Sequence, residues 1–376
     1  MEAGQKKKSI CFDALNIKRG GGVTVAHRLI VSFARAGWDV HVMLSSQEVV
    51  DLFKTDLNDQ INIHFKPDLF SVFKAIIFRH TKFEKLAKTI GAQVIFSFNF
   101  WTPSSLPQVT YHINVIPFLP VNERKEAIGT LRGTLQYFYS KKAVQNSHLN
   151  MFESQHILDL AKTRHKTPIT NPIIRYIGID IPKNISPQDD ITPAIITVTS
   201  GARHKKNDLL IDLHKKLASD GHNIGLVIGG FGKEKAIRGS LTPENNDYID
   251  TQNNIRFLGY CTREELYQEL ASAIVLVSFS ELESFFMVPL EAMAVGCPTI
   301  TTNVSSIKES VGDAGIVVNP GDVDKASDWV KKLLQTEVRE TWASKAQSWA
   351  DGFDSDDCAN RIVKSVNQLL SGSHSG

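Results

Sequence analysis

The amino-acid sequence predicts an α/β protein made of two doubly wound domains that face each other across a cleft. Short apolar strands alternate with helical stretches along the chain, an order that is typical of parallel sheets covered by helices. A length of 376 residues exceeds what one hydrophobic core usually occupies. Residues 182–193 contain three prolines and no hydrophobic periodicity, so we expect the domain boundary there.

The composition is that of an ordinary soluble globular protein, with 42% hydrophobic and 22% charged residues. The four cysteines are scattered without CxxC spacing, so we expect reduced thiols rather than disulfides or a zinc site. The first residues lack a long apolar core, and no run reaches 18 apolar residues. These features predict a cytoplasmic protein that does not cross a membrane.

The net charge of +2 conceals two halves of opposite sign. Residues 1–180 hold 23 Lys and Arg against 14 Asp and Glu, a net charge of +9, and the remaining residues carry −7. A basic first half suits an anionic partner, such as a phosphorylated acceptor or a membrane surface. A drift of surface charge explains the asymmetry equally well.

The first half begins with a predicted strand at residues 9–17, a glycine-rich loop and a helix at residues 25–37. Gly20, Gly21 and Gly22 allow positive φ angles and close backbone approach, so this loop could hold a phosphate or a sugar. A run of three glycines is weak evidence by itself.

Residues 71–91 alternate apolar and basic side chains at roughly helical spacing. One side of this predicted helix carries Phe73, Ile76, Ile77, Phe83 and Leu86, and the other carries Lys74, Arg79, Lys82, Lys85 and Lys88. Such a helix can lie on an anionic membrane leaflet. A surface helix with a core-facing stripe also fits, and it is the interpretation that we favour.

Strands are also predicted at residues 39–44, 92–98 and 108–112, and a further strand ends at Ser154. His112 lies at the end of its strand, so we expect the imidazole at a carboxyl edge, facing the cleft between the domains. A single histidine among twelve is usually a satisfied polar group.

The second half begins with a predicted strand at residues 194–200, followed by Arg203, His204, Lys205 and Lys206. Positive charge there suits a diphosphate, because Arg binds phosphate bidentately and Lys acts as a point charge. A solvated basic patch is the alternative. Residues 223–232 lack GxGxxG spacing, which argues against a nicotinamide enzyme.

The chain is organised around residues 274–319. A β-branched apolar run predicts a buried strand, and a loop then leads into a helix that begins near Pro289 and ends at Gly296. Glu283 in the loop and Glu291 in the helix can both face the space beyond the strand's carboxyl end. On spacing alone, two solvated glutamates are the better explanation.

The start of the same helix suits an anion. Backbone N–H groups near Phe286, Met287 and Val288 can donate to an anionic oxygen such as that of a diphosphate. A carboxylate deeper in the helix, Glu291, can accept hydrogen bonds from ribose hydroxyls.

These motifs resemble the most recognisable block of the GT4-type glycosyltransferases, the glycosyl transferases group 1, whose fold is GT-B. In that family the block reads Glu-Gly-Phe-Gly, then Glu-Ala-Met-Ala after three to four residues, then Gly-x-Pro. The matching residues here are Glu283-Ser284-Phe285-Phe286, Glu291-Ala292-Met293-Ala294 and Gly296-Cys297-Pro298. Ser284 and Phe286 therefore replace the two loop glycines of the family.

Weaker matches lie elsewhere in the chain. They are the Gly21-Gly22 pair, His112, the interdomain junction at residues 177–180, and the Phe-Leu-Gly segment that precedes Tyr260 and Cys261. The resemblance implies an acceptor-side domain at residues 1–178 and a nucleotide-sugar donor domain at residues 179–355. Residues 356–376 are then a helix that returns to the first domain, with a disordered tail.

The resemblance also implies an activity. It is that of a retaining hexosyltransferase, which moves a sugar from a UDP- or GDP-sugar to a glycan or lipid-linked acceptor in cell-surface polysaccharide biosynthesis. It implies no cofactor, no metal and no nucleic acid partner, and a cytoplasmic enzyme with a peripheral contact to an anionic membrane.

The resemblance assigns roles to particular residues. The implied catalytic residues are His112, Glu283, Arg203 and Lys206, with Lys205 as a substitute for Lys206. The implied donor-binding residues are Gly21, Gly22, Tyr260, Cys261, Phe286, Met287, Val288 and Glu291. In this scheme Glu291 binds ribose, Glu283 contacts the donor sugar, and the basic residues neutralise the diphosphate.

Two other functions fit the same residues, namely an epimerase or hydrolase of nucleotide sugars and a catalytically silent nucleotide-sugar-binding subunit that supports a partner transferase.

Asp354-Ser355-Asp356 formally matches the Asp-x-Asp metal motif of the other glycosyltransferase fold. These aspartates precede a predicted helix, where they serve as caps, so we expect no metal there.

Overall fold

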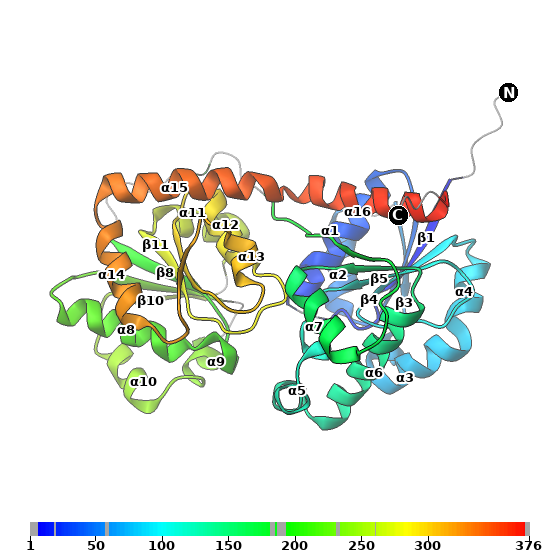
Figure 1. Ribbon diagram of the computed structural model, residues 1–376, viewed down its shortest axis with the longest axis horizontal. Helices are drawn as coiled ribbons and strands as arrows, with labels where there is room; N and C mark the ends of the chain where they lie inside the picture. Colours follow the sequence, from blue (N-terminus) through cyan, green and yellow to red (C-terminus); the bar gives the residue numbers. More distant parts are fainter. Residues whose placement is uncertain are drawn as a thin grey trace. The chain divides into compact units, whose positions relative to one another are not determined.

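The computed structural model describes residues 7–18, 20–56, 60–180, 185, 193–230, 234–259 and 261–372. These residues form two compact units, each with its own sheet (Figure 1). Unit 1 consists of Met1–Ile177 and Ser355–Gly376, and unit 2 consists of Gly178–Asp354. The resemblance implied boundaries after residues 178 and 355, and the divisions fall after Ile177 and Asp354; the first therefore precedes the proline-rich segment at residues 182–193, where composition led us to expect it. Most of the proline-rich segment and the last four residues lie outside the described residues.

Unit 1 contains a seven-stranded parallel sheet in the order β3-β2-β1-β4-β5-β6-β7, so the winding direction reverses between β1 and β4. The strands are β1 Ser9–Asp13, β2 Asp39–Leu44, β3 Ile61–Phe65, β4 Val94–Phe98, β5 Gln108–His112, β6 Leu149–Phe152 and β7 Pro172–Ile174. The helices are α1 Gly21–Arg35, α2 Gln47–Asp56, α3 Val72–Phe78, α4 Glu84–Thr89, α5 Val121–Ile128, α6 Thr130–Asn146, α7 Gln155–His165 and α16 Ser355–Leu370. The last of these packs against α1, as expected for a returning helix (Figure 1).

The core of unit 1 is centred on β1, in which every residue is buried. The ring centroid of Phe12 lies 5.1 Å from that of Phe96 in β4 and 5.4 Å from that of Phe33 in α1. Burial of each such side chain stabilises the fold by roughly 1.5–3 kcal/mol, so this cluster joins the sheet firmly to the helix.

Unit 2 contains a six-stranded parallel sheet in the order β10-β9-β8-β11-β12-β13, which reverses between β8 and β11. The strands are β8 Ala194–Val198, β9 Gly225–Gly229, β10 Ile255–Gly259, β11 Val275–Ser278, β12 Thr299–Thr302 and β13 Ile316–Val318. The helices are α8 Asn207–Ser219, α9 Glu234–Arg238, α10 Pro243–Asp250, α11 Arg263–Ser272, α12 Met287–Ala294, α13 Ile307–Val311, α14 Val323–Leu333 and α15 Thr336–Ala350.

Both faces of this sheet are covered. Successive residues of one strand join different hydrophobic clusters: Ile195 packs in one cluster and Ile196 in the other, and Val275 and Leu276 divide in the same way. Adjacent side chains of a strand point to opposite faces, which explains why these strands read as continuous apolar runs. The predicted α/β fold of two doubly wound domains is confirmed.

The glycine-rich segment differs from the prediction. Gly21 and Gly22 are the first two residues of α1 rather than part of a loop, and Gly20 is the residue with a positive φ angle, 72°, at the helix N-cap. The helix can start early because glycine at its N-cap readily adopts the positive φ angle that turns the chain into the helix. The segment Asp354-Ser355-Asp356 lies at the start of a helix, as predicted, because Asp356 is in the first turn of α16.

The segment at residues 71–91 is not one amphipathic helix. A π turn at Arg79–Phe83 (η2) separates α3 from α4, and its wider turn rotates the later side chains out of register with the earlier ones. Arg79, expected on the basic face, is 1% exposed, whereas Phe73 and Ile77, expected on the apolar side, are 54% and 62% exposed. None of the described helices is both long and apolar enough to span a bilayer.

Candidate functional site

The reversal of winding in unit 2 brings three loops to one edge of the sheet. They follow β8, β11 and β12, which are neighbours in the sheet, and all leave its carboxyl edge. In doubly wound sheets, ligands bind in the crevice at such a reversal. The first loop contains the basic residues 203–206, and the second contains Glu283, so the topology places the two predicted groups on opposite sides of the crevice.

An ion pair joins these two loops. Lys205 Nζ lies 2.5 Å from Glu283 Oε1, and the two side chains are 16% and 14% exposed. Ser280 Oγ donates a second hydrogen bond to the same oxygen at 2.7 Å. Lys205 Nζ also lies 4.9 Å from the ring centroid of Phe286, which is itself buried. The ammonium is thus held between a carboxylate and an aromatic face.

Serine side chains hold the Glu283 backbone in place. Ser305 Oγ accepts a hydrogen bond from the Glu283 N–H at 3.1 Å and donates to its carbonyl oxygen at 2.7 Å. Ser306 Oγ donates to the same carbonyl at 3.0 Å, and Thr302 donates to the carbonyl of Ser280. The loop after β12 therefore fixes the loop after β11, and the Glu283 carboxylate is preorganised by its surroundings.

The structure corrects which lysine reaches this centre. Lys206, the predicted residue, has φ 50° and turns away to pair with Glu281 at 3.1 Å, where both side chains are more than a third exposed. Arg203 is also exposed. Lys205 occupies the inner position because the short 3₁₀ turn at Arg203–Lys205 (η4) directs its side chain across the crevice.

Two glycines allow the loops beside the crevice to approach closely. A Cβ atom at Gly201 would lie 2.1 Å from the Ala236 carbonyl oxygen, and one at Gly230 would lie 2.3 Å from that of Thr199. Asn207 ties the same loop by donating to the Ser200 carbonyl at 2.8 Å. The sequence pattern did not indicate the roles of Gly201, Gly230, Asn207, Ser280, Ser305 and Ser306, nor that Lys205 is the lysine that contacts Glu283. These roles depend on contacts between loops rather than on local periodicity.

The other predicted donor-binding residues of unit 2 lie on two elements. Met287 and Val288 begin α12, and Glu291 follows one turn later, half-buried. Cys261 lies after β10, two strands from β8, which corresponds to about 10 Å at normal strand spacing. Partial burial raises the pKa of its thiol. Tyr260 lies outside the described residues.

His112 ends β5, as predicted, and its imidazole is enclosed by neighbouring side chains rather than exposed to solvent. The side chain is fully buried in unit 1, stacked on Phe152 with ring centroids 4.5 Å apart. Nε2 donates to Asn150 Oδ1 at 3.0 Å, whereas buried Nδ1 finds no hydrogen-bond partner among the described residues. Burial lowers the pKa of His112 to about 4, against a smaller opposing effect of the Asn150 hydrogen bond.

A pH-dependent stability follows from His112 and a second buried histidine. Burial, followed by the nearby His112, lowers the pKa of His165 to about 4. The unfolded chain binds these protons near pH 6.5, so the stabilisation is present at pH 7 and is lost as the pH falls from 6.5 toward 4. Each group should cost about 2 kcal/mol between pH 7 and pH 5.

Melting temperatures measured across this range should therefore fall toward acid. The decrease should be shallower for His112→Gln than for the wild type. Equal pH slopes for wild type and His112→Gln would contradict the neutral, buried state of this histidine.

A second buried ion pair lies at the reversal point of unit 1. Arg79 Nε and Nη2 donate to the two carboxylate oxygens of Asp13 at 2.5 and 2.8 Å, and Thr102 Oγ1 donates to Asp13 Oδ2 at 2.5 Å. The Arg79 guanidinium also faces the Phe100 ring at 5.1 Å. In unit 1, side chains of the protein itself therefore occupy the position beside β1 and β4 at which the winding reverses, where doubly wound sheets usually bind ligands.

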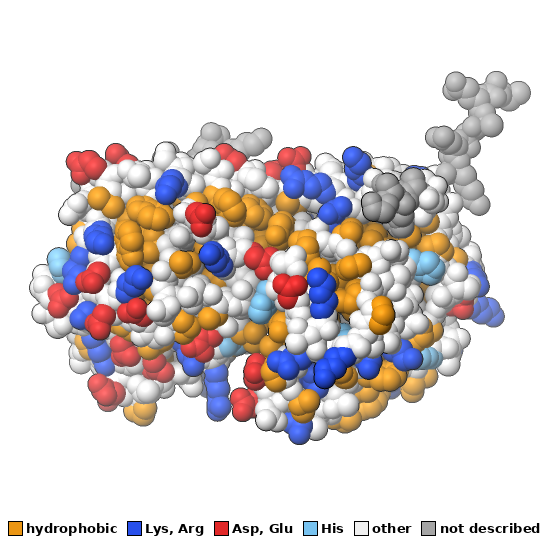
Figure 2. Space-filling view, in the orientation of Figure 1, with side chains coloured by type: hydrophobic (Ala, Val, Ile, Leu, Met, Phe, Trp, Pro, Cys, Tyr) orange, Lys and Arg blue, Asp and Glu red, His pale blue; other side chains and the backbone are white. Residues whose placement is uncertain are grey.

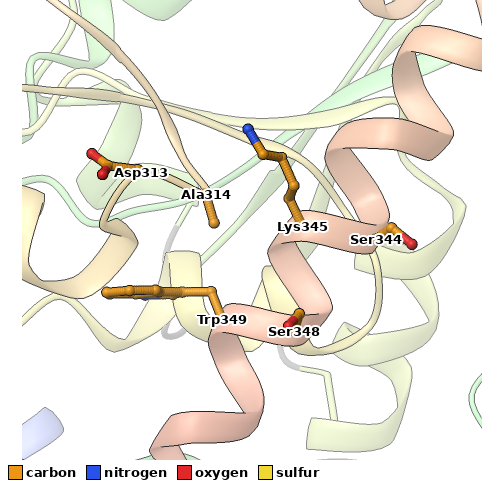
Figure 3. A pocket seen from close by; sticks show the side chains of 6 residues that line it. All are labelled: Asp313, Ala314, Ser344, Lys345, Ser348 and Trp349. Atoms are coloured by element: carbon orange, nitrogen blue, oxygen red, sulfur yellow. The ribbon is translucent and has the colours of Figure 1, made fainter.

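A pocket of about 510 Å³ lies elsewhere in unit 2 (Figure 3). Lys345 and Trp349 of α15 extend toward the side on which Asp313 and Ala314 lie, just before β13, so the pocket lies beside the amino end of that strand. Its lining residues are Asp313, Ala314, Ser344, Lys345, Ser348 and Trp349. None of them is a predicted site residue, and the pocket lies away from the carboxyl-edge crevice.

Parts of this chain resemble known proteins. The family model described as glycosyl transferases group 1 matches residues 180–349. The O-antigen chain mannosyltransferase B of Escherichia coli is 36% identical over 116 residues, which cover 31% of this chain and 30% of that protein. A GDP-mannose-dependent monoacylated alpha-(1-6)-phosphatidylinositol monomannoside mannosyltransferase of Corynebacterium glutamicum is 29% identical over 159 residues, 40% of each chain. The chain thus spans well under half the length of these curated relatives.

The fold extends further than the sequence similarity. A sucrose-phosphate synthase structure from Thermosynechococcus elongatus covers 98% of this chain with a TM-score of 0.76 at 16% identity, and all of that chain is matched. This likeness gives the GT-B fold to both units. The domain at residues 180–349, which contains the Lys205 and Glu283 crevice, matches the family model of the glycosyl transferases group 1.

Proposed function

We propose that the protein is a retaining glycosyltransferase of the hexosyl type, which uses a UDP- or GDP-sugar as donor and a glycan or lipid-linked acceptor. The observation that carries this proposal is the Lys205 and Glu283 pair at the crevice of the domain that matches the family. The O-antigen and phosphatidylinositol mannoside names of two relatives support cell-surface polysaccharide or glycolipid synthesis as the setting.

The crevice suits the breaking of a sugar–diphosphate bond. When the bond between the anomeric carbon and the phosphate oxygen breaks, its electron pair stays on the diphosphate, which gains negative charge. An ammonium fixed in a partly buried crevice stabilises that charge more than water does. Lys205 is the best placed cation for this role, with Arg203 and Lys206 as outer positive charges, and Glu283 can accept hydrogen bonds from hydroxyls of the donor sugar.

The donor nucleotide is proposed to lie between α12 and the loop after β10. Met287 and Val288 offer backbone N–H groups at the helix start, while Glu291 is placed one turn later for ribose hydroxyls. The phenylalanine at residue 286 does not obstruct this position with an exposed ring, because its side chain is buried beneath Lys205.

Replacing Glu291 by alanine should weaken binding of free UDP or GDP. A ribose hydroxyl would lose a charge-assisted partner, which is worth roughly 1.5–3 kcal/mol, or about 10- to 150-fold in affinity. Calorimetric titration with the nucleoside diphosphate measures this change, and Glu309→Ala on α13 serves as a comparison. Unaltered affinity in Glu291→Ala would remove this glutamate from the site.

The same proposal includes a reaction without metal, in which fixed cations replace a divalent ion at the diphosphate. Across the described ranges of the chain, no group of three or more His, Cys, Asp or Glu side chains is arranged to hold a metal ion. A cytoplasmic location also belongs to the proposal, supported by four free cysteines, of which Cys11, Cys297 and Cys358 are buried.

The test is transfer by the purified chain. A panel of UDP- and GDP-sugars is incubated with extracted lipid-linked and soluble glycans, with and without EDTA, and the anomeric configuration of the product is read by NMR. We expect transfer with retention that EDTA leaves unchanged. Donor hydrolysis or epimerisation alone would favour the epimerase or hydrolase, and donor binding without turnover would favour the silent subunit. Loss of activity in EDTA and recovery with manganese would reject the metal-free reaction.

A further inference from the structure

Unit 1 exposes a group of large apolar side chains on two helices and a turn. Phe70 ends the 3₁₀ turn at Pro67–Phe70 (η1), Phe73 and Ile77 lie on α3, and Leu131 and Phe138 lie on α6. All five are between 50% and 62% exposed. The spacing of four residues in α3 and of seven in α6 places the side chains of each helix on one face. We call them, together with the basic residues described next, the apolar-basic surface.

Basic side chains are interspersed among these apolar ones. Lys18 Nζ lies 3.9 Å from the centroid of the Phe70 ring and donates to the Phe70 carbonyl oxygen. Lys142 Nζ lies 5.8 Å from the Phe138 ring. Lys74 and Arg132 are exposed beside Phe73 and Leu131. The lower part of unit 1 in Figure 2 shows this mixture of orange and blue side chains.

The turn that follows α3 contacts α6, and Lys18 beside Phe70 lies near the start of α6, so the two groups of apolar side chains lie on neighbouring elements. His80, in the turn after α3, lies 3.0 Å from the Tyr139 hydroxyl, and Tyr139 is adjacent to Phe138 in α6. At the other end, partial burial, followed by repulsion from Arg132 and then Arg79, lowers the pKa of Lys18. Such repulsion requires Lys18 and Arg132 to lie near each other, which joins the η1 end to the start of α6.

The charge balance of this area is positive. Helix α6 contains three basic residues, Arg132, Lys141 and Lys142, and no acidic one. Asp68 is the acidic residue of η1. Glu84, at the start of α4, is already engaged with Lys88 at 2.8 Å and with Ser105. A partner that binds this surface must therefore be complementary both to exposed aromatic rings and to an excess of positive charge.

We infer that the apolar-basic surface docks unit 1 on an anionic lipid bilayer, with Phe70, Phe73, Ile77, Leu131 and Phe138 entering the headgroup region and the surrounding Lys and Arg contacting lipid phosphates. This inference rests on the proposed function, since it identifies the membrane as the place where a lipid-linked acceptor is met. A contiguous apolar area on a monomer marks an interaction site. Lysine is depleted from protein–protein interfaces but favoured beside apolar residues at membrane surfaces, so the lysines select lipid over protein.

The surface differs from the one suggested by sequence pattern. Arg79 cannot contact lipid because it is buried against Asp13, and Phe83 is buried in the core of unit 1. Lys82 lies within the π turn, and Lys85 and Lys88 follow it. All three are exposed, yet the apolar residues among them, Phe83 and Leu86, are buried and half-buried. These three lysines therefore supply a matched control for the charge of the surface.

The experiment measures sedimentation of the full chain with vesicles of phosphatidylcholine alone or of phosphatidylcholine with about 30% phosphatidylglycerol. On the anionic vesicles each basic residue near the surface should contribute about 1 kcal/mol to binding. The wild type should bind the anionic vesicles at low salt and lose most of that binding at high salt. Phe73→Ser with Ile77→Ser, and Lys74→Gln with Arg132→Gln and Lys142→Gln, should each lower the partition coefficient at least about tenfold.

The control variant changes Lys82, Lys85 and Lys88 to Gln and should retain most of the binding. If it loses as much as the Lys74, Arg132 and Lys142 variant, net charge rather than this surface drives association, and the inference fails. Wild type that ignores anionic vesicles at low salt also overturns it. A dimer in light scattering that Phe73→Ser with Ile77→Ser dissociates would instead assign the surface to a second copy of the chain.

Nucleoside diphosphate titration on every variant separates this inference from the proposed function. Normal nucleotide binding without vesicle binding would reject the membrane surface alone. Vesicle binding without nucleotide binding would reject the proposed donor site alone. Circular dichroism of each variant establishes that it is folded, so that lost vesicle binding is read as a change of surface.

Discussion

Lys205→Ala is expected to lower turnover about 100- to 1,000-fold, the range seen when one preorganised group that stabilises transition-state charge is removed. The effect should fall mainly on kcat, because the charge on the diphosphate grows as the glycosidic bond breaks. Removing the ammonium also leaves Glu283 beside Ser280 without its cation. Steady-state kinetics with a fixed acceptor measures both parameters.

The adjacent Lys206 provides the matched control for this prediction. It carries the same charge one residue along the chain but pairs with Glu281 in a more exposed position, where solvent weakens electrostatic effects. We expect Lys206→Ala to lower kcat less than tenfold, which is an estimate of about 1.4 kcal/mol or less. A larger loss in Lys206→Ala than in Lys205→Ala would reverse the assignment and restore the residue chosen from the family pattern.

Arg79→Ala is expected to destabilise unit 1 by about 3–5 kcal/mol, because it leaves the Asp13 carboxylate buried without its cation. Asp13 would retain the hydrogen bond from Thr102, which cannot replace two charged donors. Hydrogen exchange of the β1 and β4 amides reports the opening free energy of unit 1 separately from that of unit 2.

Two variants test the cause of this loss. Arg79→Met combined with Asp13→Leu removes both charges, and it should cost less than Arg79→Ala because no unpaired charge is left buried. Lys82→Ala changes an exposed basic residue of the same turn and should be nearly neutral. A double variant as unstable as Arg79→Ala would assign the effect to lost packing around the guanidinium instead of to electrostatics.

The sequence by itself determined the fold class, the two units and most strands. Buried parallel strands are continuous apolar runs, and runs such as residues 39–44 and 194–198 were recognisable because the nearest neighbours along the chain decide that pattern. The place of Glu283 in a loop at a carboxyl edge, and of Glu291 within the following helix, was also predictable, because strand, loop and helix succeed one another locally. The family resemblance implied a returning helix from residue 356, and α16 begins at Ser355.

Only the tertiary structure decided which side chains meet. Lys205 and Lys206 have the same chemistry in the sequence, and they differ because the turn before α8 sends one toward Glu283 and the other toward Glu281. The sequence pattern placed Arg79 on an exposed basic face, but in the structure the π turn directs it to Asp13, 66 residues earlier in the chain. His112 was expected at a carboxyl edge of the sheet, and only the tertiary structure shows that Phe152 and Asn150 of β6 contact its ring. In each case the deciding contact joins segments that lie far apart in the chain, and local periodicity contains no information about such contacts.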